Sequence, residues 1–225
     1  MDNEGVCQMN LEKLRKEVSG LCTVKTKFTC DSRLSRICPA YIINQGLSSY
    51  KILILNSLSN EETIQVEAHE LAHLLLAHLN PGLISFTPKG TRPIDWLKEA
   101  VNNTISHKTI IDILLTDYNI SSDVHLAGLS SSINGISKQI EKCYCLPDLI
   151  KVRLGVILFD IERTLPNSEV EVARVSSMNS RVREALVASR NHLSLISTKM
   201  ERAAQYQEVR NFIESIWCKP EPLFS

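Results

Sequence analysis

The sequence has no excess of charge of either sign, because 25 basic side chains balance 25 acidic ones among 225 residues. A protein that grips a nucleic-acid backbone usually carries a basic excess. The balance therefore argues against DNA or RNA as a direct ligand. The hydrophobic share of 44% and the charged share of 22% are ordinary for a folded protein, so the composition excludes disorder as the main state.

We expect neither a secretory signal nor a membrane span, and the sequence contains no CxxC pair. The first residues show no basic start followed by an apolar run. The longest apolar stretches, such as Leu74–Ala77, are far shorter than the roughly 18 residues that a membrane span needs. We therefore expect a cytoplasmic protein with no membrane partner. The seven cysteines are odd in number and irregularly spaced, so we expect reduced thiols and no disulfide framework.

What is present favours an α+β fold. Three β-like runs, at residues 23–28, 40–43 and 51–55, predict a small antiparallel sheet. A helix is expected from about residue 60 to residue 79, with Ser59 as its cap. A second helix should follow a loop and run from residue 94 or 95 to about residue 115.

The residue pattern of the C-terminal part predicts helix along its whole length. Residues 167–217 contain no glycine and no proline, and their apolar positions predict one long helix or a helical hairpin. We expect a domain over residues 1–160 and an all-helical C-terminal segment over residues 161–225. The apolar stripe of that segment faces either its own core or a second chain, as in a homodimer.

The motif His69-Glu70-Leu71-Ala72-His73 carries the chemistry. Residues four apart lie on one face of a helix, so both imidazoles can reach one ion. Glu70 can then contact a bound water without ligating the metal, as in HExxH zinc peptidases. His78 follows His69 by nine residues, which rotates it to the opposite face.

A catalytic zinc needs a third protein ligand. Glu99, on the second expected helix, would complete a His₂Glu site, and Asp95 one turn earlier competes for that place. Asn103, one turn later, could hydrogen-bond to a ligand and orient it.

The same segments resemble the ImmA/IrrE-like zinc metallopeptidases, which are gluzincin-like. The resemblance is carried by the strand Ile52–Asn56, by Ala68–Leu76 with its HExxH motif, and by Glu99–Asn103, where Asn102 stands in place of the usual alanine. A later element of the family has its counterpart at Cys145–Leu154. The resemblance implies a sheet packed on zincin-type helices. It also implies a regulatory protease that cleaves a helix-turn-helix transcriptional repressor in a stress, phage or mobile-element response.

The expected reaction is amide hydrolysis with Zn²⁺ bound and Glu70 as the proton carrier. The alternative is a non-catalytic interaction module that uses the zinc fold to bind a partner protein through its helical C-terminus. Thiol regulation through Cys143-Tyr144-Cys145 is a further possibility, against the commoner case of inert buried cysteines. His107 and His125 could stabilise a developing oxyanion, although a surface position is the commoner role for such histidines.

Overall fold

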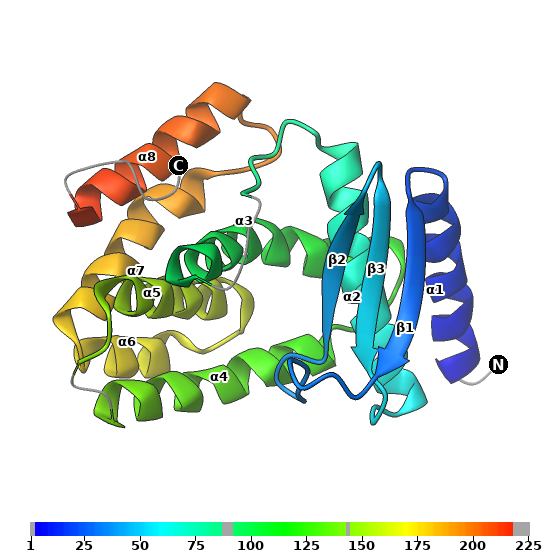
Figure 1. The fold of residues 1–225 in the computed structure, drawn as a ribbon, viewed down its shortest axis with the longest axis horizontal. Helices are drawn as coiled ribbons and strands as arrows, with labels where there is room; N and C mark the ends of the chain where they lie inside the picture. Colours follow the sequence, from blue (N-terminus) through cyan, green and yellow to red (C-terminus); the bar gives the residue numbers. More distant parts are fainter. Residues whose placement is uncertain (1–2, 87–91, 143–144, 218–225) are drawn as a thin grey trace. The chain divides into compact units, whose positions relative to one another are not determined.

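The computed structural model describes residues 3–86, 92–142 and 145–217 (Figure 1). The elements in chain order are α1 (Asn3–Ser19), β1 (Thr23–Thr29), β2 (Ala40–Gly46), β3 (Ser49–Leu55), α2 (Asn60–Leu79), α3 (Pro93–Asp117), α4 (Asp123–Lys142), α5 (Asp148–Thr164), α6 (Glu169–Ser177), α7 (Ser180–His192), the 3₁₀ turn η1 (Leu193–Leu195) and α8 (Arg202–Trp217). The α+β class is confirmed. Over these residues, the helices lack the combination of length and apolar character needed to cross a membrane.

The chain divides into two compact units, each considered over its described residues. The first unit comprises Met1–Leu79 and Thr109–Ser131, and the second comprises Asn80–Lys108 and Ser132–Ser225. The division falls within α3 and α4, so each of these helices contributes residues to both units. The domain boundary expected between residues 160 and 161 stays a prediction.

The sheet of the first unit is mixed, with the strand order β1-β3-β2. β2 pairs with β3 antiparallel, as expected, but β1 pairs with β3 in parallel. The prediction of a purely antiparallel sheet is therefore wrong. Alternation of apolar residues identifies a strand, but it does not fix which strand becomes the neighbour. Here the residues between β1 and β2 carry the chain to the far edge of the sheet, and β3 returns through the middle.

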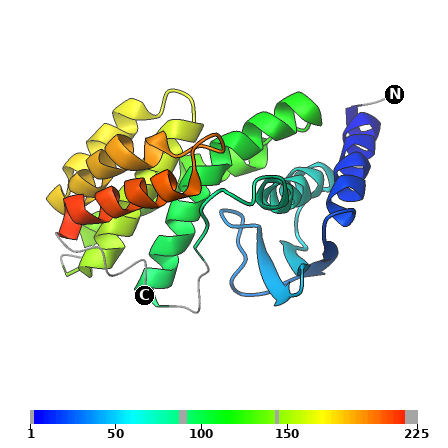
Figure 2. The same ribbon diagram turned by 90° about the horizontal axis from the view of Figure 1, so that it is seen from above.

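Helix α2 covers the sheet together with α1. Both helices lie on the same side of the three strands (Figure 2). The side chains of Ile52 and Ile54 in β3 are fully buried beneath them. The expected cap of α2 is confirmed as a capping box, in which the Ser59 hydroxyl accepts from the Glu62 N–H at 3.2 Å and the Glu62 carboxylate accepts from the Ser59 N–H at 2.7 Å.

The second unit is helical, and its tightest helix crossing lies between α5 and α7. Gly155 of α5 meets α7 so closely that a Cβ there would lie 2.5 Å from the carbonyl oxygen of Val182. The expected helical C-terminal segment is confirmed, but it is divided into α6, α7, η1 and α8. Most of its apolar stripe is buried within this unit, at Val182, Leu186, Leu193, Ile196, Val209, Phe212 and Ile216.

Candidate metal centre

His69 and His73 lie one turn apart on α2, in the first unit. Their ring centroids are 4.9 Å apart and the ring planes meet at 78°. His69 is buried, whereas His73 and Glu70 are only half-buried. The expected pairing of the two imidazoles is therefore present, and Glu70 follows the more buried ring.

A buried carboxylate ties α2 to its neighbours. Glu67 accepts from the guanidinium of Arg15 in α1 at 2.9 and 2.6 Å, and from the Thr26 hydroxyl in β1 at 3.1 Å. Only 2% of Glu67 is exposed. The hydrogen bond from Arg15 to this carboxylate raises the pKa of the Arg15 guanidinium. This clamp fixes α2 relative to α1 and β1, two residues before His69.

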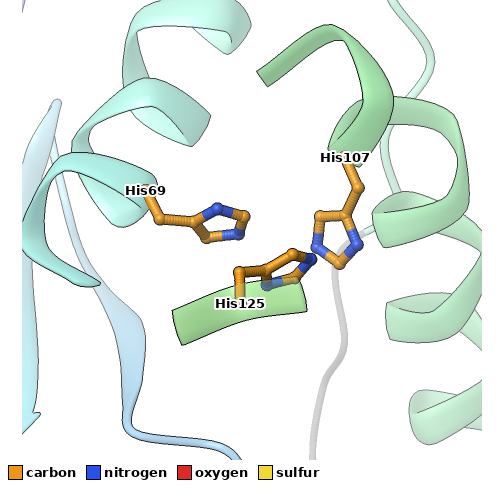
Figure 3. A group of neighbouring side chains, drawn as sticks. All are labelled: His69, His107 and His125. Atoms are coloured by element: carbon orange, nitrogen blue, oxygen red, sulfur yellow. The ribbon is translucent and has the colours of Figure 1, made fainter. Parts of the chain in front are cut away.

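A third histidine of the first unit lies against His69. The ring of His125, in the first turn of α4, stacks on the ring of His69 with centroids 4.2 Å apart and planes inclined by 21°. Figure 3 labels both rings, His69 projecting from α2 and His125 from α4. One ring nitrogen of each lies within 4.8 Å of one of the other. The first unit thus places His69 next to two other imidazoles.

The start of α4 is held to α2 at the same place. Gln65, one helical turn before His69, accepts from the backbone N–H of Val124 at 3.0 Å. On the following turn, a Cβ at Gly128 would lie 3.0 Å from the Ile37 carbonyl oxygen, so α4 runs close to the segment that precedes β2. His125 therefore sits between two residues whose backbones are fixed within the first unit.

His107, also labelled in Figure 3, belongs to the second unit. Its Nδ1 lies 2.7 Å from a carboxylate oxygen of Asp160 in α5, and both side chains are 6% exposed. The Thr164 hydroxyl donates to the other oxygen of Asp160 at 3.4 Å. A carboxylate in this position orients an imidazole ring and selects its tautomer.

The two acids and the amide that the sequence predicts for a metal site lie on α3 in the second unit. Glu99 is exposed. Asp95 is 1% exposed and accepts from the Arg92 guanidinium at 3.2 Å, so it is engaged in an ion pair. Asn103 is half-buried, and its backbone carbonyl lies 3.4 Å from the Ser106 hydroxyl. The roles of Glu99 and Asn103 stay predictions.

Asn102 has a structural role. Its side chain accepts from the Phe86 N–H at 2.8 Å and donates to the Phe86 carbonyl at 2.7 Å. Gln205 of α8, which is 1% exposed, accepts from the Ile84 N–H at 2.8 Å and donates to the Gly82 carbonyl at 3.3 Å. Two side-chain amides therefore fasten the segment that follows α2 inside the second unit.

The remaining histidines and cysteines have other surroundings. His78 bonds through Nδ1 to the Leu74 carbonyl at 2.8 Å and packs edge-on against Tyr50, which agrees with a position at the helix end. His192 lies 3.1 Å from the carboxylate of Glu208. Cys143 and Tyr144 lie outside the described residues, and the adjoining Cys145 is exposed.

Sequence reasoning missed the residues that act through long-range contacts. Gln65 carried a local signal, because a glutamine on the buried face of an apolar helix needs a partner. Nothing in the local sequence linked Asp160 to His107, which lies 53 residues away.

The sequence matches no family model, and no curated protein or solved structure is similar to it at a significant level.

Proposed function

We propose that the chain is a zinc-dependent endopeptidase in which His69 and His73 hold the metal and Glu70 carries the proton. The observation that supports this most directly is the pair of neighbouring imidazoles on one turn of α2. Glu70 follows His69 in the chain and is half-buried. A site that admits both water and substrate requires this partial exposure.

The donors fit the metal. Tetrahedral zinc binds imidazole nitrogen at about 2.0–2.1 Å, so two bound nitrogens lie about 3.4 Å apart. Rings with centroids 4.9 Å apart reach this arrangement by small side-chain rotations. A bound zinc ion would polarise the scissile carbonyl and acidify the attacking water. The resemblance to the ImmA/IrrE-like peptidases implies Glu99 as one candidate for the third ligand, a position that the two histidines of α2 leave open.

Glu70 then has two tasks in sequence. Its carboxylate takes a proton from the attacking water and later delivers it to the leaving amine nitrogen. A carboxylate suits this exchange because it is a base before the attack and an acid after it. The buried clamp at Glu67 holds α2, which carries Glu70 and both rings, against α1.

The substrate class follows from the resemblance, which implies a helix-turn-helix repressor. Such a substrate is cytoplasmic, and the proposal places the peptidase there too. The alternative, a non-catalytic module that binds through its C-terminal helices, gains no support from the apolar stripe. Most of the side chains of that stripe are buried within the second unit and are occupied by its own core.

The test is cleavage of a proteome-derived peptide library by the zinc-loaded protein, followed by mass spectrometry. We expect new peptide termini that disappear with a chelator. In the Glu70→Gln variant they should form at least about a hundred-fold more slowly, although zinc stays bound. The same termini at the native rate with Glu70→Gln, or no cleavage by the zinc-loaded native chain, would contradict the peptidase proposal.

A further inference from the structure

We propose that His125 is the third protein ligand of the metal, so that the centre is built from three imidazoles and not from two imidazoles and Glu99. This inference rests on the proposed metal centre and deepens it. It follows from residues of the first unit alone. The ring centroid of His69 lies 4.9 Å from that of His73 and 4.2 Å from that of His125.

The position of His125 is fixed by its neighbours in the chain. The residue before it is bonded to Gln65 on α2, the helix that carries His69 and His73. The residue three positions after it, Gly128, approaches the Ile37 carbonyl too closely for a side chain to be accommodated without a shift. Contacts in the first and second turns of α4 therefore leave His125 little freedom. Gln65 is therefore a positioning residue for His125.

The ligand chemistry is consistent with this assignment. Three neutral imidazoles form an established ligand set for catalytic zinc and leave a fourth position open. One ring nitrogen of His69 and one of His125 lie within 4.8 Å, whereas two nitrogens on one zinc ion would lie about 3.4 Å apart. On binding, the stack would therefore open slightly and the His73 ring would turn toward the same point. A zinc ion held by three neutral imidazoles would keep a net charge of about +2, whereas one held by two imidazoles and a glutamate would have a net charge of about +1.

The experiment measures zinc affinity by competition with a chromogenic chelator, using the whole chain. His125→Phe keeps a flat ring in the stack and removes both nitrogens. We expect this variant to lose more than about a hundred-fold in affinity, because even partners that only support a ligand contribute 10–100-fold. His192→Ala is the neutral control and should bind zinc as the native chain does. Glu99→Gln removes the competing candidate ligand and discriminates between the two ligand sets, because it should keep native affinity only if His125 is the third ligand. X-ray absorption of the zinc-loaded native chain should show three imidazole ligands.

A second substitution, His125→Gln, and thermal unfolding without zinc separate ligand loss from misfolding. Native affinity in His125→Phe, or a loss confined to Glu99→Gln or to His107→Phe, would overturn the inference. Each of these outcomes would leave the peptidase proposal standing if cleavage persists. Zinc binding that depends on His125 but is accompanied by no cleavage would support the inference and contradict the peptidase proposal. Absence of zinc binding by the native chain would contradict both the inference and the peptidase proposal.

Discussion

The backbone N–H of Val124 donates to the side chain of Gln65 at 3.0 Å, which joins the first turn of α4 to the middle of α2. Gln65, His69 and His73 follow one another at intervals of four residues, so they share a face of α2. One helical stripe therefore both anchors the neighbouring helix and supplies two imidazoles. The local geometry of the candidate centre depends on this stripe.

Gln65 provides the first prediction. Gln65→Met keeps the length of the side chain and removes its carbonyl acceptor. We expect a loss of about 1 kcal/mol in the free energy of unfolding, because the Val124 N–H loses its partner. We also expect zinc affinity to fall by about 10–100-fold, the usual effect of removing a group that orients a ligand. Urea unfolding and chelator competition measure the two effects.

Gln207→Met is a matched control, because Gln207 lies on α8 in the second unit and its amide donates to Asn211 on the same helix. It should leave zinc affinity unchanged. Zinc affinity that is native in Gln65→Met, with a normal loss of stability, would show that the bond to Val124 supports the fold but not the centre.

The second prediction concerns the crossing of α5 and α7. Gly155→Ala should lower the free energy of unfolding by about 1–3 kcal/mol, because the new methyl group would meet the backbone of α7 at Val182 and Leu186. Gly135→Ala is the matched control, since Gly135 lies in α4 with no heavy atom near a Cβ. It should raise stability by about 0.5–1 kcal/mol through helix propensity. Equal effects of the two substitutions would contradict the close packing.

The third prediction is a dependence on pH at the start of α2. The hydrogen bond from the Ser59 N–H, with help from the Ser59 hydroxyl and Arg36, lowers the pKa of Glu62 below its ordinary value. A group whose pKa is lowered by folding adds stability above its unfolded pKa, which is about 4.3 for glutamate. That contribution disappears as the pH falls through the lower folded value.

Glu62→Gln tests this dependence, because glutamine keeps a hydrogen-bonding side chain at the third position of the capping box but does not titrate. The native chain should be more stable than this variant at pH 7, and the difference should shrink as the pH is lowered from about 5 to 3. Chemical unfolding over this range gives the comparison. A difference that stays constant with pH would show that the carboxylate charge contributes nothing.

Local signals predicted the elements of the first unit well. The helix at residues 60–79 and the three strands followed from capping, alternation and the stop at Asn80-Pro81-Gly82. The direction of β1 and the start of α4 did not follow. The serine-rich run before residue 132 weakened the helical signal, although Leu129, Ile133, Ile136 and Ile140 mark a buried helical face.

Of the candidate centre, only the part within one helix could be predicted. His69 and His73 are linked by the period of α2, so their proximity followed from the sequence. His125 lies 56 residues after His69 (125 − 69), and its stacking depends on how α4 packs against α2. The bond between His107 and Asp160 depends in the same way on α3 packing against α5. No periodicity along the chain encodes either contact.

Metal analysis of the purified chain after zinc loading and dialysis tests the central claim most directly. The account predicts one zinc ion per native chain and none per chain of the His69→Ala/His73→Ala variant, whose fold is checked by circular dichroism. A native chain without zinc, or one zinc ion retained by the folded double variant, would contradict it.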